Sequence, residues 1–239
     1  KELESFSYSV SHDLRAPLRA VSGFAQIIAR RHRASLNEEG QRYIDNIVLA
    51  SQRMSELIDD LLAYTRMGRS AVSKDVIPLG EILEPLATDL SARIHDSQGT
   101  LAISDDPPMV LGDRTLLRQV FTNLLENALT YRKPGTPLHV SVTCENAEGA
   151  VIVCVADNGI GIAAEFHEKI FNIFQRLHSD DDYPGTGIGL ATVKKCVELL
   201  DGQVWVESTM EEGSRFFVKL PQGRPVSRAE DHNHASIDG

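Results

Sequence analysis

The chain has 239 residues, 42% hydrophobic and 24% charged, the composition of a globular protein long enough for one large or two smaller domains. Its formal net charge of -10 at pH 7 comes without a dense basic stripe, which excludes the surface of a duplex-binding protein, so we expect no nucleic-acid partner. No apolar run approaches the about 20 residues that cross a bilayer, so we expect no membrane insertion by this chain.

The start of the chain and its cysteines indicate where the protein resides. It opens on Lys1 inside a helical pattern, without an initiator methionine or signal peptide, which predicts a fragment whose upstream part is missing. The odd number of cysteines, none in a C-x-x-C pair, fits a reducing compartment and predicts buried core thiols at Cys144, Cys154 and Cys196. We therefore expect a cytoplasmic location, whether the whole protein is soluble or anchored upstream.

The first 33 residues or so predict a long amphipathic helix. Its apolar residues form two rows with a seven-residue spacing, typical of a heptad seam. The rows are Leu3, Val10, Pro17 and Phe24, and Leu14, Val21 and Ile28. His12 lies off this seam with Asp13 beside it, so its imidazole should project from the helix bundle toward solvent. Pro17 follows five residues later and is expected to bend the helix.

A second long helix is predicted to end near Arg66. Ser35 and Glu38 have the spacing of a capping box at its start, and Gly68 is the expected stop. Its seam alternates by three and four residues over Ile44, Ile47, Ser51, Met54, Ile58, Leu61 and Thr65. Two such helices cannot bury both seams alone, so residues 1–66 are expected to form a helical hairpin that dimerises as a four-helix bundle.

Residues 67–76 are polar and lack periodicity, which predicts a linker. From residue 77 the pattern becomes mixed α and β up to residue 221, and the tail 222–239 is expected to be disordered. Helices are predicted over residues 82–94, over 113–131 with Asp113 as cap, up to Phe174, and over 190–200. Strands are predicted over residues 101–103, 138–143, 151–156, 203–207 and 215–220. The predicted fold class is therefore α+β.

Two glycine-rich segments are suited to a nucleotide. Residues 157–162 follow a predicted strand, so Asp157 is expected to be held at the sheet edge, while Gly159 and Gly161 let a ligand approach the backbone. Residues 185–190, Gly-Thr-Gly-Ile-Gly-Leu, open a helix whose N-terminal N–H groups favour phosphate oxygens. Neither segment is a Rossmann fingerprint or a P-loop, because the required spacing and the Gly-Lys-Ser/Thr ending are absent.

Two asparagines and an aromatic pair complete an ordered set. Asn123 and Asn127 share one face of a predicted helix, where an amide oxygen could ligate a hard cation such as Mg²⁺. With Phe171 and Phe174, this set resembles the sensor histidine kinases of two-component systems. Residues 1–66 are similar to their dimerisation and histidine-phosphotransfer domain, and residues 77–221 to their Bergerat-fold (GHKL) ATP-binding domain, an α/β sandwich. Residues 6–15 and 175–178 most resemble members linked to phytochrome or PAS sensors.

The resemblance implies a reaction centred on His12. His12 would attack the γ-phosphoryl group of ATP, with Asp13 orienting the ring and accepting its proton. The phosphate would then pass to an aspartate on the receiver domain of a response regulator. Members that also dephosphorylate this partner have Thr or Asn four residues beyond the histidine, where this chain has Ala16, so we expect weak phosphatase activity. The attack within one chain or across the homodimer stays open.

The resemblance also implies a binding site for ATP and Mg²⁺. Its residues would be Asn123, Asn127, Asp157, Gly159, Gly161, Phe171, Phe174, Arg176, Gly185, Thr186, Gly187, Gly189 and Leu190. Asn127 would hold Mg²⁺ with Asn123 in support, and Asp157 would accept a hydrogen bond from adenine. The glycines at 185, 187 and 189 would hinge a lid over the phosphates, anchored by the two phenylalanines.

The chain departs from the family in the basic residues expected near the phosphates. The family has a lysine three residues after the second asparagine, and this chain has Thr130. Arg132 or Lys133 could substitute, and Arg176 is a candidate to neutralise the γ-phosphate. Two alternatives therefore stay open beside the kinase: a relay module that binds nucleotide poorly, and an ATPase of the same fold. A PAS-, GAF- or phytochrome-like sensor is expected upstream.

Overall fold

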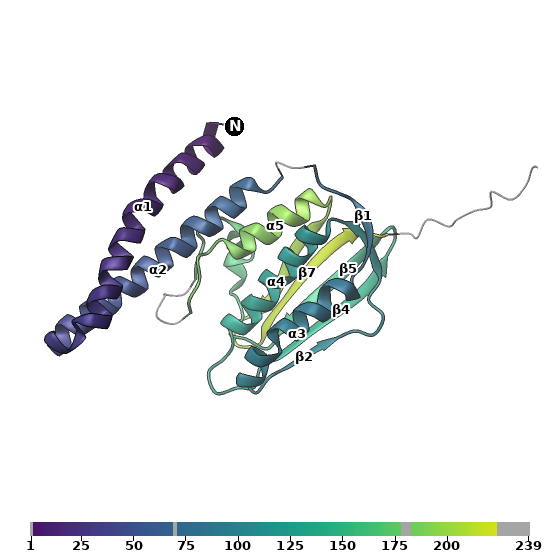
Figure 1. The fold of residues 1–239 in the computed structure, drawn as a ribbon. Helices are drawn as coiled ribbons and strands as arrows, with labels where there is room; N and C mark the ends of the chain where they lie inside the picture. Colours follow the sequence, from purple (N-terminus) through teal and green to yellow (C-terminus); the bar gives the residue numbers. More distant parts are fainter. Residues whose placement is uncertain (1, 69–70, 178–182, 224–239) are drawn as a thin grey trace, which may run out of the picture.

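The structure is a computed structural model that describes residues 2–68, 71–177 and 183–223, with side chains described from residue 15 onward. A helical hairpin comes first, built from α1 (Glu2–Arg31), a 3-10 turn (Arg33–Ser35) and α2 (Glu38–Arg66). The two long helices lie side by side, apart from the sheet of the second domain (Figure 1). Both predicted helices are confirmed, and α1 continues through Pro17.

The start of α2 differs from the predicted capping box. The capping residue is Asn37, whose side-chain oxygen accepts a 2.8 Å hydrogen bond from the backbone N–H of Gly40. Ser35 lies instead in the preceding 3-10 turn. Asn37 has the extended backbone of an N-cap and directly precedes the first helical residue, so its short side chain reaches the third N–H of the helix. The expected stop is confirmed at Gly68, which has a positive φ of 82°.

Within one chain, the hairpin buries only part of the predicted seams. Its buried side chains are Leu18, Ala25, Ile44, Ser51, Ile58 and Leu62. By contrast Val21, Phe24 and Ile28 of α1 stay exposed, Phe24 to 68%, and so do Ile47 and Met54 of α2. The contact of α1 with α2 is thus shifted off the predicted α1 seam, because each helix packs against its hairpin neighbour along one edge of its apolar face. Among the described side chains, the other edge forms an exposed apolar strip that includes Val21, Phe24, Ile28, Ile47 and Met54.

The second domain is a sheet covered on one face by helices. In chain order its elements are β1 (Asp75–Pro78), α3 (Gly80–Asp96), β2 (Thr100–Ile103), β3 (Met109–Gly112), α4 (Arg114–Thr130), β4 (His139–Ala147), β5 (Ala150–Asp157), two 3-10 turns (Ala164–Phe166 and Lys169–Phe171), α5 (Gly189–Leu199), β6 (Gln203–Thr209) and β7 (Gly213–Pro221). Five strands pair in the order β2-β4-β5-β7-β6, with β2 and β4 parallel and the other pairs antiparallel. Helices α3, α4 and α5 lie on the same side of this sheet (Figure 1).

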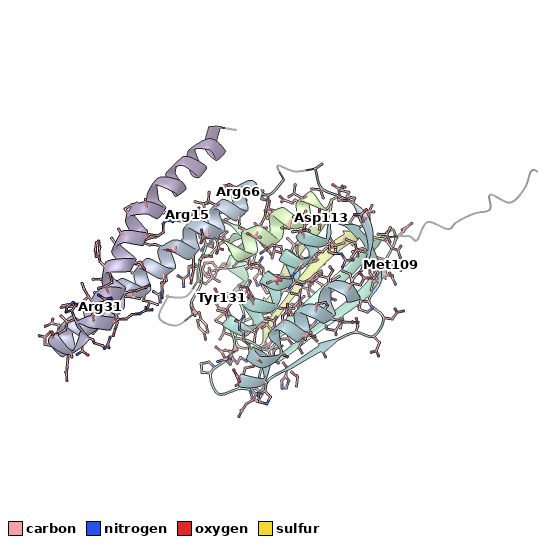
Figure 2. The ribbon with its side chains drawn as sticks, in the orientation of Figure 1. Arg15, Arg31, Arg66, Met109, Asp113 and Tyr131 are labelled. Carbon is pink, nitrogen blue, oxygen red and sulfur yellow. The ribbon has the colours of Figure 1, made fainter. Side chains whose placement is uncertain are left out.

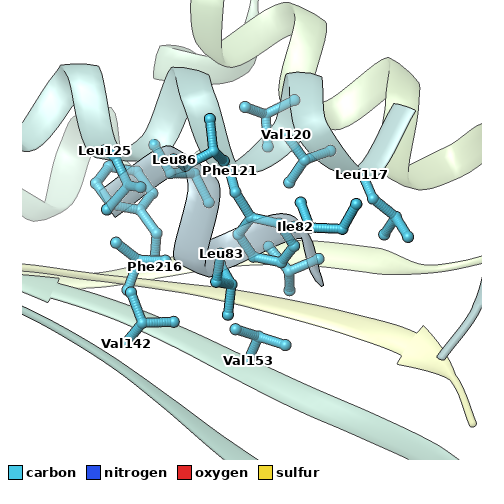
Figure 3. Close-up of a cluster of buried hydrophobic side chains, with 14 of the residues drawn as sticks. Ile82, Leu83, Leu86, Leu117, Val120, Phe121, Leu125, Val142, Val153 and Phe216 are labelled. Atoms are coloured by element: carbon cyan, nitrogen blue, oxygen red, sulfur yellow. The ribbon is translucent and has the colours of Figure 1, made fainter. Parts of the chain in front are cut away.

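The core lies between these helices and the sheet. Phe121 of α4 and Leu83 of α3 are fully buried and point toward Val153 and Phe216 on the strands (Figure 3). The predicted cap of α4 is confirmed, since the carboxylate of Asp113 accepts hydrogen bonds from the N–H groups of Thr115 and Leu116. The α+β class follows directly from this layered arrangement.

Three predicted boundaries are wrong. Strand β1 begins at Asp75, inside the predicted linker, and pairs with β3, which was not predicted, in a separate two-stranded sheet. The predicted helix up to Phe174 is two 3-10 turns, because Asn172 is extended and the chain turns back so that the N–H of Phe174 reaches the carbonyl of Gly187. Of the predicted tail, Gln222 pairs with Val110 on β3, and residues 224–239 lie outside the described residues.

One of the three cysteines is buried and the other two are half-buried. Cys196 is buried with its sulfur 3.7 Å from that of Met67, and burial raises the pKa of its thiol to about 11. Cys144 and Cys154 are only half-buried, unlike the core thiols predicted, although Cys144 packs against the edge of the core. Among the described residues, every helix is too short or too polar to cross a bilayer.

Candidate functional site

A cavity opens between α4, the end of β5 and the start of α5, with an empty volume of about 570 Å³ that includes space open to solvent. It is lined by Asn127, Tyr131, Asp157, Ile160, Gly161, Ile162, Ile170, Gln175, Arg176, Leu177, Leu190, Ser214 and Phe216. Most of these side chains are apolar. We call this cavity the chamber.

A wider and more polar groove, with an empty volume of about 1230 Å³ that includes open solvent, adjoins the chamber. The two share Asn127, Tyr131, Ile170, Gln175 and Leu190. The groove is lined by Glu56, Asp60, Arg93, Asn123, Glu126, Asn127, Thr130, Tyr131, Ile170, Gln175, Pro184, Gly185, Thr186, Gly187, Gly189 and Leu190. An apolar chamber that continues into a polar groove suits a ligand with a flat ring at one end and a charged group at the other.

Asp157, the last residue of β5, places one carboxylate in the wall of the chamber. Its Oδ1 accepts a 2.8 Å hydrogen bond from the N–H of Gly159. Burial raises the pKa of the Asp157 carboxyl, while hydrogen bonds from the N–H groups of Gly159 and Ser214 and the charge of Lys133 lower it. The pairing of β5 with β7 puts Ser214 directly opposite. The site therefore offers a fixed acceptor to an N–H donor on an apolar ring.

The two glycines after Asp157 have different roles. Gly161 lines the chamber, with a positive φ of 74°, and an added Cβ would lie 2.0 Å from the carbonyl oxygen of Thr209. Gly159 does not line it; an added Cβ there would lie 2.4 Å from the carbonyl oxygen of Tyr131. Gly159 thus lets the turn pack on the end of α4, where Ile160 also donates to Tyr131. Only Gly161 is placed to meet a ligand.

Asn123 and Asn127 project from α4 toward the groove, as predicted. Asn127 lines both the chamber and the groove, whereas Asn123 lines the groove alone. The Nδ2 of Asn123 donates to the carbonyl of Gln119, so its Oδ1 is directed toward Gly189. These neutral oxygens fit a Mg²⁺ ion that takes most of its ligands from phosphate and water. No cluster of three His, Cys, Asp or Glu side chains that could bind a metal occurs within the described residues.

The second glycine turn lines the groove and touches the hairpin. Gly185, Thr186, Gly187 and Gly189 all lie along the groove, and α5 begins at the last of them. The hydroxyl of Thr186 donates a 2.7 Å hydrogen bond to the carboxylate of Asp60 on α2.

Helix α5 makes further contacts with α2. The Lys195 ammonium group donates a 2.7 Å hydrogen bond to the carbonyl of Tyr64 and lies 4.2 Å from the centroid of its ring. The side of α5 that bears Lys195 therefore docks along the C-terminal half of α2, next to the glycine turn (Figure 1).

Of Phe171, Phe174 and Arg176, only the arginine lines the chamber. Phe171 is packed in the core and Phe174 is 57% exposed, and neither lines the chamber or the groove. Their role as anchors of a lid over a nucleotide therefore stays a prediction, with Phe171 directed inward by the 3-10 turn. Phe174 still holds the glycine turn through its N–H bond to Gly187. Arg176 lines the chamber and donates a 2.8 Å hydrogen bond to the carbonyl of Tyr183.

Several lining residues were not predicted. Tyr131 lies one helical turn after Asn127, at the C-cap of α4, so the spacing along that helix could have identified it (Figure 2). Gln175, Ser214 and Phe216 reach the chamber through long-range contacts that no local pattern indicates.

His12 and Asp13 belong to α1, and their side chains lie outside the described part of the structure. One turn later Arg15 extends from α1 toward α2 and forms an ion pair with Asp59 (Figure 2). The neighbouring Asp60 is the residue that binds Thr186 of the glycine turn. The backbone of the histidine segment and the glycine turn therefore lie near the same stretch of α2.

Comparison with known proteins matches both parts of the chain. Residues 2–70 match the model of the His Kinase A (phospho-acceptor) domain, and residues 112–224 that of the histidine kinase-, DNA gyrase B- and HSP90-like ATPase. Phytochrome-like protein Cph1 of Synechocystis is 37% identical over 93% of this chain and 29% of that protein. Methanogenesis regulatory histidine kinase FilI of Methanothrix harundinacea is 31% identical over 92% of this chain and 25% of that protein.

A solved structure extends the likeness to both domains. Full-length ShkA in complex with AMPPNP superposes with a TM-score of 0.68 at 27% identity, over 92% of this chain and 46% of that one. The chain spans 29% of the length of the phytochrome-like relative Cph1. The hairpin, the helix-covered sheet and the matches to both family models together show that the chain belongs to the sensor histidine kinases of two-component systems.

Proposed function

We propose that this chain is the ATP-dependent catalytic core of a protein-histidine kinase. It phosphorylates His12 and passes the phosphate to an aspartate on the receiver domain of a response regulator. The observation that carries the proposal is the half-buried carboxylate of Asp157 in an apolar chamber, continuous with a groove lined by two asparagines and a glycine turn at a helix N-terminus. The chamber fits an adenine ring and the groove fits a triphosphate.

Each part of the site has a role in binding. Asp157 accepts a hydrogen bond from the exocyclic amino group of adenine, and the apolar side chains around it exclude water. The N–H groups at the start of α5, which begins at Gly189, face the groove and favour phosphate oxygens. Asn127, supported by Asn123, would hold Mg²⁺ against the phosphates. When bound, that ion would neutralise charge that develops during phosphoryl transfer.

The transfer itself uses the two neighbouring residues on α1. A ring nitrogen of His12 attacks the γ-phosphorus, and the nitrogen–phosphorus bond forms as the bond to the β,γ-bridging oxygen breaks and ADP leaves. Asp13 orients the ring and accepts the proton from it. Ala16, which is exposed one turn later, carries no group that could position a water molecule. We therefore infer weak phosphatase activity toward the partner.

Incubation of the chain with γ-labelled ATP and Mg²⁺ tests the proposal. Acid-labile label on the protein is expected, and His12→Gln should abolish it while ATP affinity stays unchanged, because α1 contributes no described residue to the lining of the chamber or the groove. Steady phosphate release without labelled protein would favour an ATPase of the same fold instead. Failure to bind ATP would favour a relay module.

The exposed apolar strip of the hairpin supports dimerisation through residues 1–66. Phe24→Glu is expected to convert a dimer into a monomer, because it places a charge on the most exposed of the strip's large side chains. The molar mass from light scattering after size-exclusion chromatography measures this.

Leu49→Glu is the matched control for Phe24→Glu. Leu49 is also exposed, to 46%, but lies two residues past Ile47, off the α2 seam. The control variant should therefore remain a dimer. A dimeric Phe24→Glu chain would contradict the assignment of the strip to the interface.

A further inference from the structure

The groove proposed to hold the ATP phosphates contains little positive charge. Among the described residues that line it, three are carboxylates, Glu56, Asp60 and Glu126, and Arg93 is the single basic side chain. A triphosphate is a polyanion, and cationic side chains that contact it are normally part of its binding site. Arg93 is therefore the side chain whose charge and place match the ligand.

The position of Arg93 relative to Thr130 strengthens this match. Arg93 lies near the end of α3 and lines the groove together with Thr130 of α4. The same two residues also line an adjoining pocket, so their side chains are neighbours. Thr130 is short, and its hydroxyl donates a 2.8 Å hydrogen bond to the carbonyl of Glu126. A lysine at position 130 would occupy the space that Arg93 now faces.

The contact that holds Arg93 in place is weak enough to be exchanged. Its Nη1 lies 3.5 Å from a carboxylate oxygen of Glu126, and the side chains are 53% and 47% exposed respectively. Exposed ion pairs of this kind contribute between about 0 and 1 kcal/mol. The guanidinium can therefore leave Glu126 for a phosphate oxygen at little cost.

The other Lys and Arg side chains that the structure describes near the site lie outside the groove. The Lys133 ammonium group donates to the carbonyl of Glu211, and Lys133 lines neither the chamber nor the groove. Arg132 lines the adjoining pocket but not the groove. Arg176 lines the chamber, where its guanidinium donates to the carbonyl of Tyr183.

We propose that Arg93 is a phosphate-binding residue of this kinase and supplies, from α3, the positive charge that the family places on α4 at the position of Thr130. This inference rests on the proposed function and adds one residue to its nucleotide site. Because Arg93 acts on the phosphates and not on the ring, it should distinguish ATP from adenosine.

The test compares Arg93→Gln with Arg118→Gln in the full 239-residue chain. Arg118 is the matched control, because it forms an ion pair with Asp89 between the same two helices but does not line the groove. Titration calorimetry with Mg²⁺ is expected to show about a tenfold loss of ATP affinity for Arg93→Gln and unchanged adenosine affinity. Arg118→Gln should match the unaltered chain with both ligands. Thermal unfolding followed by circular dichroism checks that the variants are folded.

A double variant tests whether Arg93 takes the place of a lysine at position 130. Thr130→Lys introduced into Arg93→Gln should restore most of the ATP affinity, a rescue that a purely structural role of Arg93 would not give. Unchanged ATP affinity in Arg93→Gln, an equal loss of ATP and adenosine binding, or no rescue would overturn the inference while leaving the kinase proposal intact. If the unaltered chain bound no ATP, the proposed function would be wrong and the inference with it.

Discussion

Asp157→Asn is expected to lower the affinity for ATP about 100-fold while the domain stays folded. A hydrogen bond to a charged acceptor contributes about 1.5–3 kcal/mol, and the neutral amide also presents an N–H group to the donor on adenine. Titration calorimetry measures the loss. Glu207→Gln is the control, since Glu207 is an exposed carboxylate on β6 that does not line the chamber.

The same residue predicts how binding depends on pH. Because burial raises the pKa of the Asp157 carboxyl, protonation begins at a higher pH than for an exposed aspartate. ATP affinity of the unaltered chain should therefore fall as the pH is lowered toward that raised pKa, since the protonated carboxyl loses its charged acceptor. The ATP affinity of the Asp157→Asn variant should lack this dependence on pH. Equal affinities for the variant and the unaltered chain at neutral pH would remove Asp157 from the site.

Gly161→Ala is expected to remove most of the stability of the second domain, at least about 4 kcal/mol, which is a large share of a typical domain's total. A Cβ at this position would lie 2.0 Å from the carbonyl oxygen of Thr209 and 3.0 Å from the Cα of Met210. Two stretches of backbone would have to move apart to accept it. Urea unfolding followed by circular dichroism measures the loss.

Gly135→Ala separates the effect of crowding from that of backbone conformation. Gly135 has almost the same φ, 73° against 74°, but an added Cβ would meet nothing within 4 Å. Replacing Gly135 by alanine should therefore lower the free energy of unfolding by only about 1–2 kcal/mol, which is the cost of left-handed backbone at a residue that has a side chain. Similar losses for the two variants would show that the packing against Thr209 is not what requires Gly161.

Much of the fold follows from local sequence patterns. The helices of the hairpin and of the second domain carry sustained apolar periodicity, and Asp113 is a cap that local sequence identifies correctly. The failures have non-local causes. Strand β1 has only four residues, and its partner β3 is distant in the chain, so pairing and not composition makes it a strand. Near Phe174, tertiary contacts prevented a helix that periodicity favoured.

The candidate site was predictable where a motif fixes the backbone. Asp157, Gly161 and the turn from Gly185 to Gly189 follow strands or open a helix, so their place is set locally. Arg93 could not be found in this way. It lies on a helix distant in sequence from every nucleotide-binding motif, and only the packing of α3 on α4 brings it to the groove.

The glycine turn docks on α2, and this contact sets the position of the turn along the hairpin axis. Arg15 pairs with Asp59, and residue 12 lies three residues, or about 4.5 Å, further toward the start of α1. In an antiparallel hairpin that height faces the α2 residues just beyond Asp59, where Asp60 binds Thr186. The glycine turn and the backbone of residue 12 thus lie at nearly the same height along the hairpin. The proposed transfer from ATP to His12 therefore needs little sliding of the nucleotide domain along the hairpin axis.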